Sequence, residues 1–393
     1  MVTAVTGPGT AALPEGDRID FAELRRSRRA RLVSAMVSGG LDVLLLGRAA
    51  NIQFATGARQ LWTSGARPFG PGGVVVRQTG RIHLLSTWDE GVPAEIGTEE
   101  LFGMTWNGAN LMARLAAIPG LREARRVGTD GVGPATEQLL AALAPAAELV
   151  DATPVLRAAR SRKSPEEVAC IATAAALAEG ALVALSDGVG PGVTERQLAG
   201  IHSARLAELG APTPGWEAAA CATAGPGPVH LRRVPTDRTL AAGELVALTA
   251  SAMYAGYEAD VARTVVCPER AERGSGGPSR RAGHPRPVGE LLDRGRAAQA
   301  ALIRACRPGA TGADIQRAWA ATGEALPPEP LVFGIGLGLE APVIGPGLGS
   351  HEELEEGMTL RVQAWVDEEG LGGVLRADVV LVTADGAEVL TRA

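Results

Sequence analysis

The segment from Gly243 to Val266 constrains the fold of this chain more than any other stretch. Two apolar runs rich in residues that favour strands flank Ala255-Gly256, and this pattern predicts a β-hairpin. The second strand carries the charged residues Glu258, Asp260 and Arg263 among its apolar residues.

The hairpin resembles the metal-binding hairpin of the creatinase, prolidase and aminopeptidase P family, whose second strand ends Gly-Tyr-x-x-Asp-x-x-Arg-Thr. The matching residues here run from Gly256 to Thr264. Asn51–Gly57 is similar to the family's Asn-x-x-Tyr-x-Thr-Gly loop, and Arg160–Glu167 matches the start of its catalytic domain. The resemblance implies an α/β (α+β) fold class, with an N-terminal creatinase-like α/β domain plus a C-terminal pita-bread domain.

The pattern of elements agrees with two domains. Strands alternate with helices over the first 150 or so residues, which is typical of an α/β domain. Capping boxes at Ser164 and Thr194 predict two helices after a linker at 151–163. We therefore expect a flexible arm at 1–19, domains at 20–152 and 153–393, and a mobile insertion at 268–288, which is rich in Pro, Gly and Arg.

Composition excludes several classes of function. The net charge of −6 offers no general attraction to nucleic acid or anionic membranes. The N-terminus lacks the apolar core of a signal peptide, and no apolar run approaches the ~20 residues that a membrane span needs, so we expect a cytoplasmic protein. The four cysteines have no CxxC spacing, which argues against a disulfide framework or a zinc site.

The metal ligands of the family are mostly replaced. In the family, two Asp, one His and two Glu hold two cations. The matching positions here are Thr249, Asp260, Phe333, Gln363 and Ala377. Phenylalanine and alanine offer no donor atom, and threonine and glutamine are weak neutral ligands. The sequence therefore predicts no dinuclear centre, no metal ligands and no cofactor.

His230 is the candidate acid–base group. It precedes the hairpin as the family's substrate-contacting histidine does, and imidazole titrates near neutral pH. The resemblance to creatinase, which works without metal, implies an acid–base role for His230. Asp260 would orient His230 or bind a cationic substrate group. Two alternatives stay open: a vestigial or buried His230, and an Asp260 that only pairs with Arg263.

Further residues lie in segments where the family contacts its substrate. These candidates for substrate binding are Arg59, Trp62, Arg67, Trp216, Tyr254, Phe333, Gln363, Trp365 and Arg376. Core packing is the competing explanation for the aromatic residues, and a plain solvent loop for the arginines. Because relatives are dimers in which the N-terminal domain of one subunit reaches the other's cleft, the resemblance implies a homodimer with shared active sites and a small-molecule substrate.

Two hypotheses follow from these residues. The first is a metal-independent, creatinase-like enzyme that acts on a small amide, amidine or amino-acid-derived substrate with His230 as acid–base group. The alternative is a catalytically inactive pita-bread protein that serves as a binding or scaffold protein. Phe333 and Ala377 argue against a functional Xaa-Pro metallopeptidase.

Overall fold

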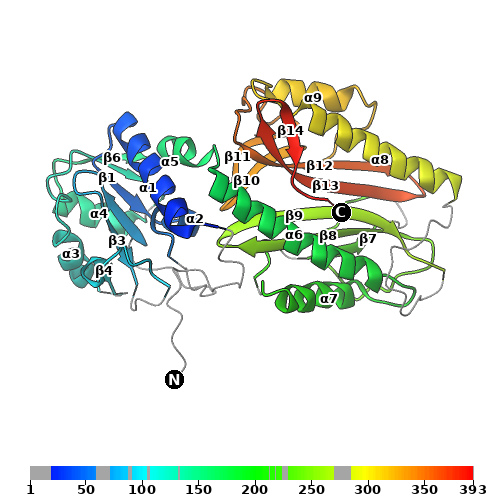
Figure 1. The fold of residues 1–393 in the computed structure, drawn as a ribbon, viewed down its shortest axis with the longest axis horizontal. Coiled ribbons are helices and arrows are strands. Elements are labelled where there is room, and N and C mark those ends of the chain that lie inside the picture. The colour runs from blue at the N-terminus through cyan, green and yellow to red at the C-terminus, as the bar shows by residue number, and fades with distance from the viewer. Residues whose placement is uncertain are drawn as a thin grey trace. The chain divides into compact units, whose positions relative to one another are not determined.

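The chain divides into two compact units, Met1–Glu166 and Glu167–Ala393. The structure is a computed structural model that describes residues 19–58, 71–86, 91–103, 107–131, 133–211, 213–216, 218–223, 229–269 and 285–392. Both expected architectures are present, an N-terminal α/β unit and a C-terminal unit with one large curved sheet (Figure 1).

The N-terminal unit is built on a mixed six-stranded sheet in the order β4-β3-β2-β1-β5-β6. Strand β1 pairs antiparallel with β2 and parallel with β5. The strands are β1 (Val43–Leu46), β2 (Gly73–Val76), β3 (Arg81–Leu85), β4 (Leu101–Phe102), β5 (Arg126–Thr129) and β6 (Glu148–Asp151). The helices are α1 (Phe21–Ser38), α2 (Ala49–Thr56), α3 (Gly108–Ala116), α4 (Pro134–Leu143) and α5 (Thr153–Arg160), with a short 3₁₀ turn at Thr98–Glu100.

Helix α1 forms where the sequence predicts it. The side chain of Asp20 accepts a hydrogen bond of 2.9 Å from the backbone N–H of Glu23, which caps the first turn. Two expectations for this unit are wrong. Asn51–Thr56 lies in helix α2 and not in a loop, and the helix ends at Gly57, which adopts the left-handed conformation at φ 71°. The expected linker contains α5, which packs against α1.

The C-terminal unit is an eight-stranded sheet in the order β11-β10-β12-β13-β9-β8-β7, with β14 paired to β13. Its helices are α6 (Pro165–Gly188), α7 (Glu195–Glu208), α8 (Arg286–Ala305) and α9 (Gly312–Ala320). Its strands are β7 (Ala219–Ala222), β8 (Leu245–Tyr254), β9 (Tyr257–Val266), β10 (Val332–Gly336), β11 (Gly338–Ile344), β12 (Thr359–Glu368), β13 (Gly372–Thr383) and β14 (Gly386–Val389).

The predicted hairpin is confirmed as β8 and β9. Its two-residue turn has Ala255 at φ 50° and Gly256 at φ 83°, as a turn with positive φ at both central positions requires. The register pairs Thr249 with Ala262 and Ser251 with Asp260. These four residues therefore lie on one face of the sheet.

The helices cover the opposite face. Residues of α6 and α7 pack against Val246, Leu248 and Val261, and residues of α8 and α9 pack against Leu360 and Val362 (Figure 1). Because side chains alternate along a strand, neighbours such as Asp260, Arg361 and Gln363 face away from the helices. The core of this unit thus lies between the helices and the sheet. The face of the sheet that is turned away from the helices carries polar side chains.

Helix α6 corrects one expectation from composition. Pro165–Gly188 is long and apolar enough to cross a membrane by length and composition, with a mean hydropathy of 2.0 over its best window. Four of its residues, Ala178, Ala181, Leu182 and Leu185, are buried in the cluster that packs on the sheet. A core helix meets the same length and composition test.

Candidate functional site

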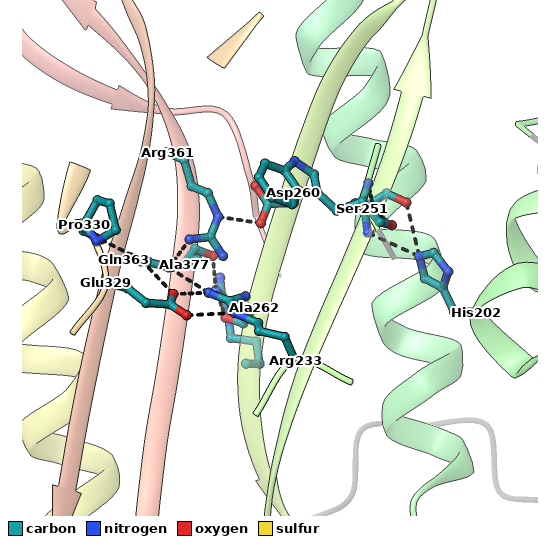
Figure 2. Close-up of polar contacts among 12 residues, drawn as sticks. His202, Arg233, Ser251, Asp260, Ala262, Glu329, Pro330, Arg361, Gln363 and Ala377 are labelled. Atoms are coloured by element: carbon teal, nitrogen blue, oxygen red, sulfur yellow. Dashed lines mark hydrogen bonds and ion pairs between the residues drawn. The ribbon is translucent and has the colours of Figure 1, made fainter. Parts of the chain in front are cut away.

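A buried ion pair lies at the centre of the helix-free face. The guanidinium of Arg361, on β12, donates from Nε to Oδ2 of Asp260 on β9 (Figure 2). Arg361 is 2% exposed and Asp260 3% exposed, so both charged groups are buried from solvent. The guanidinium lies 5.4 Å above the centre of the Phe333 ring. A buried charge of this kind persists only when it is paired and hydrogen-bonded.

Three further side chains extend this contact into a network. Arg361 also donates to Oε1 of Gln363, and the Gln363 amide donates to the carbonyl oxygen of Pro330 at 2.5 Å (Figure 2). Glu329 accepts a 3.1 Å hydrogen bond from Nε of Arg233 and a second one from its Nη2. The Gln363 amide also donates to Oε2 of Glu329 at 3.3 Å, so the network runs from Asp260 through Arg361 and Gln363 to the Glu329–Arg233 pair.

Four polar atoms on this face are buried and have no hydrogen-bond partner among the described residues. They are Oγ1 of Thr249, Oε1 of Glu258, Oδ1 of Asp260 and Nη2 of Arg361. All four residues are more than nine-tenths buried. An unsatisfied buried polar group costs about 1–3 kcal/mol, so four of them on one face indicate a place where a ligand or water binds. We call these four residues the open cluster.

Within the open cluster, the pKa of Glu258 is raised well above that of an ordinary carboxyl. Burial, followed by the negative charge of Asp260, raises the pKa of the Glu258 carboxyl to about 7. Glu340 adds to the rise, while the Trp216 side chain and the Arg361 charge oppose it. Glu258 therefore exchanges a proton in the neutral range, unlike an exposed carboxyl.

The segment 213–216 covers one end of this face. The Trp216 backbone N–H donates to Oγ of Ser251 at 2.8 Å, and that hydroxyl donates to the Trp216 carbonyl at 2.7 Å. A Cβ at Gly215 would lie 3.1 Å from the Cβ of Glu258. On the helix side, Nε2 of His202 lies 3.1 Å from the Ser251 carbonyl oxygen (Figure 2). These contacts fix the position of the β8 backbone beside Glu258.

The structure brings together some of the residues that the sequence singled out. Phe333, Gln363 and Asp260 meet around Arg361. Trp365 lies on the same face, but it packs in a buried apolar cluster with Ala262 and Ala377, which agrees with the core-packing alternative. Trp216 is half-exposed beside Ser251.

Other predicted site residues lie elsewhere. His230 is exposed, while its neighbours Val229 and Leu231 pack on the apolar cluster, so the described contacts do not join His230 to Asp260. Arg376 lies on the helix side, where its Nε donates to Gln299 of α8 at 2.9 Å. Tyr254 ends β8 at the turn, paired with Tyr257.

The alternative that pairs Asp260 with Arg263 is wrong. Arg263 donates to Oδ1 of Asp378 at 2.7 Å, whereas Asp260 is held by Arg361. Arg59, Trp62 and Arg67 lie outside the described residues, as does most of the expected insertion at 268–288. The shared active site of a homodimer therefore stays a prediction.

The residues on this face do not fit a two-metal centre. Thr249 and Gln363 are neutral, Phe333 and Ala377 have no donor atom, and the remaining carboxylate, Asp260, is already paired with a guanidinium. Within the described ranges, no group of three or more His, Cys, Asp or Glu is placed to hold a metal ion. Two divalent cations about 3.5–4 Å apart require several anionic ligands.

This donor set predicts a low metal content. Protein purified without chelator should contain less than about one Mn, Co, Zn or Fe per chain, because Asp260 alone offers a free carboxylate oxygen at these positions. Elemental analysis of dialysed protein measures the content, with a protein-free dialysate as control. Two equivalents of bound metal would contradict the assignment of the ligand positions.

Arg361 is the functional candidate that sequence reasoning missed. One feature of the sequence could have indicated Arg361. Polar and apolar residues alternate along Leu360-Arg361-Val362-Gln363-Ala364, and a charged residue in such a strand is unusual. Period-two alternation puts Arg361 and Gln363 on one face, but it names no partner for them. The partner, Asp260, lies 101 residues earlier in the chain.

Comparisons with known proteins find relatives in sequence and similar folds among solved structures. A model of metallopeptidase family M24 matches residues 169–384, and one of the creatinase/prolidase N-terminal domain matches residues 28–162. The chain is 26% identical over 251 residues to the Xaa-Pro dipeptidase of Pyrococcus furiosus, covering 61% of this chain and 65% of that protein. It is 30% identical to that of Lactobacillus helveticus over 251 residues, which cover 61% of this chain and 62% of that protein.

The matches thus span less than two thirds of these curated relatives. Among solved structures, the Xaa-Pro dipeptidase of Bacillus anthracis superposes with a TM-score of 0.73 at 20% identity, covering 94% of this chain and 98% of that one. The prolidase of Pyrococcus horikoshii gives a TM-score of 0.72 at 20% identity over 93% and 98%. These structures show the same two-domain, pita-bread fold.

These matches correct the functional hypotheses drawn from the sequence. The hypothesis of a metal-independent, creatinase-like enzyme with His230 as acid–base group is contradicted, because the matched relatives and structures are Xaa-Pro dipeptidases and prolidases. The alternative of an inactive binding or scaffold protein finds no support in them either. The expected family and fold class are confirmed.

Proposed function

Because the chain belongs to metallopeptidase family M24, we propose that it is a hydrolase that cleaves the amide bond of a small, dipeptide-like substrate. The relatives named as Xaa-Pro dipeptidases support this substrate class. The observation that carries the proposal is the open cluster on the helix-free face, where a donor and several acceptors are buried and have no hydrogen-bond partner in the part of the chain that the structure describes.

Arg361 has the geometry to hold the substrate carbonyl. Its Nε and one Nη are occupied by Asp260 and Gln363, which fixes the orientation of the planar guanidinium. The remaining Nη2 has no partner among the described residues, so it can donate to the carbonyl oxygen of a bound amide. A fixed donor at this position stabilises the negative charge that develops on that oxygen when water adds.

Asp260 and Gln363 act on the substrate through Arg361. Both accept hydrogen bonds from it, and Gln363 is itself held by the Pro330 carbonyl. The guanidinium is therefore fixed before the substrate arrives, and its orientation does not have to be established during the reaction.

The test is hydrolysis of a panel of Xaa-Pro dipeptides, measured by release of free proline. We expect proline to be released faster than in buffer without protein. We expect Arg361→Lys to lower kcat/KM by about 10²–10³-fold, because lysine keeps the positive charge but lacks the planar set of N–H donors of the guanidinium. The matched control is Arg286→Lys, since Arg286 is 90% exposed at its side chain. The proposal fails if no dipeptide of the panel yields proline, or if Arg361→Lys cleaves as fast as the unmodified protein.

A further inference from the structure

Arg376 carries a positive charge that no carboxylate of the described chain neutralises by an ion pair. It lies on β13, on the face of the sheet that α8 covers, and its side chain is partly exposed. Its Nε donates to Oε1 of Gln299, but no described residue accepts a hydrogen bond from Nη1 or Nη2. Neither Nη atom is among the fully buried atoms without a partner, so both reach solvent.

The guanidinium of Arg376 is held in one orientation by its neighbours. Gln299 is 3% exposed, and its Nε2 donates to Oδ2 of Asp378 at 2.8 Å, so both ends of its amide are used. Oδ1 of Asp378 accepts from Arg263 at 2.7 Å and from the Thr391 hydroxyl at 2.6 Å. Because these donors occupy both oxygens of Asp378, this carboxylate does not serve as the counter-ion of Arg376.

Two further guanidiniums make the surroundings of Arg376 electropositive. Burial, followed by the positive charge of Arg263, lowers the pKa of Arg376 to about 10; Arg296 adds to this effect and Asp378 opposes it. Arg296 lies on α8 and pairs with Asp293, and both side chains are more than half exposed. A partly buried cation beside other cations is costly unless an anion approaches it. The cluster of Arg263, Arg296 and Arg376 therefore favours an anionic ligand.

The shape of the cluster indicates which anion fits. The Nη1 and Nη2 atoms of a fixed guanidinium match two oxygens of a carboxylate or a phosphate. A phosphoryl group carries a charge of about −1.5 to −2 near pH 7, so it offsets more of the positive charge than a single carboxylate does. Because Arg376 is only partly exposed, the ligand must present this group at its end.

We propose that Arg376, with Arg263 and Arg296 beside it, binds the phosphoryl group of a small anion on the helix-covered face of the C-terminal sheet. This site is separate from the open cluster. Ala377, the next residue of β13, packs with Trp365 on the helix-free face, so Arg376 lies on the other side of the sheet. The proposal goes beyond the proposed hydrolysis and does not depend on it.

The experiment is calorimetry on the full chain with inorganic phosphate, glycerol phosphate and acetate, at an ionic strength held constant with sodium chloride. We expect phosphate and glycerol phosphate to bind with a Kd of about 1 mM or below, and acetate to bind at least about tenfold more weakly. Binding of both phosphates identifies a terminal phosphoryl group as the ligand, and binding of inorganic phosphate alone identifies free phosphate. No binding of either phosphate up to about 10 mM, or acetate bound as tightly, would overturn the inference.

The variant Arg376→Gln removes the charge and the two exposed N–H groups. It should weaken phosphate binding at least about tenfold. The matched control is Arg286→Gln, an arginine of α8 whose side chain is 90% exposed, and it should leave the affinity unchanged. Unchanged phosphate affinity in a folded Arg376→Gln protein contradicts the assignment.

A second variant keeps the test decisive if Arg376→Gln fails to fold by circular dichroism. Arg296→Gln changes an exposed side chain of the same cluster, so the fold should tolerate it. It should weaken phosphate binding by about twofold to fivefold, because it removes one nearby positive charge in a partly solvated place. An affinity equal to that of the unmodified chain would then reject the site.

Discussion

Arg361→Met should lower the free energy of unfolding of the C-terminal unit by about 3–5 kcal/mol, because it leaves the buried carboxylate of Asp260 without its cation. Gln363 loses a partner at the same time. Urea unfolding at pH 7, followed by tryptophan fluorescence, measures the change. Trp319 and Trp365 are both buried in this unit, so their emission reports on its packing.

Two controls show whether the unpaired charge is the cause. The double variant Arg361→Met with Asp260→Asn removes both charges and should be less destabilised than Arg361→Met alone. Arg286→Met removes an exposed arginine that pairs with Glu290 within one helix, and it should change stability by less than about 0.5 kcal/mol. Wild-type stability of Arg361→Met would mean that the ion pair is not formed in solution.

Glu195→Ala should be the second strongly destabilising change, by about 2–5 kcal/mol, because it leaves the backbone N–H groups of Ala222 and Thr236 without their acceptor. The side chain of Glu195 is fully buried at the start of α7 and accepts from the backbone of Ala222 at 3.0 Å and of Thr236 at 2.9 Å. The Thr236 hydroxyl donates at 2.8 Å, and Arg232 forms an ion pair with it. One carboxylate thus connects α7, β7 and the segment before the hairpin. Urea unfolding at pH 7 measures the loss, and Glu208→Gln, whose side chain is 64% exposed on the same helix, is the control.

The same residue predicts a pH dependence. Burial alone would raise the pKa of the Glu195 carboxyl, but the hydrogen bonds from Thr236 and Ala222 and the Arg232 contact together hold it below its ordinary value. A carboxyl whose pKa is lowered by folding stabilises the fold above its unfolded pKa of about 4.3, and this contribution is lost as the pH falls through the folded pKa. The stability advantage of the unmodified chain over Glu195→Gln should therefore shrink between about pH 5 and pH 3. An advantage that stays constant over that range would contradict the lowered pKa.

The sequence by itself determined the hairpin, the family and the two-domain fold, since these depend on local patterns. Alternation of apolar residues on both sides of Ala255-Gly256 specifies two strands and their turn, and the caps at Asp20 and Thr194 specify where helices begin. Local patterns did not predict secondary structure correctly in segments whose conformation depends on tertiary packing. The linker forms helix α5 because that segment can bury Leu156 and Ala159, and Asn51–Thr56 is helical although it was expected to be a loop.

The identity of the polar partners was decided only by the tertiary structure. Asp260 is close in sequence to Arg263, but these neighbours on β9 are three positions apart, which places them on opposite faces. Asp260 therefore meets Arg361 across the sheet, and Arg263 meets Asp378. His230 carries a suitable group in a suitable position along the chain, yet its extended segment buries Val229 and Leu231 and leaves the imidazole exposed. Side-chain chemistry can be listed from a sequence, but the choice among distant partners depends on strand order and on which face each residue occupies, because contacts form between faces and not between neighbours in the chain.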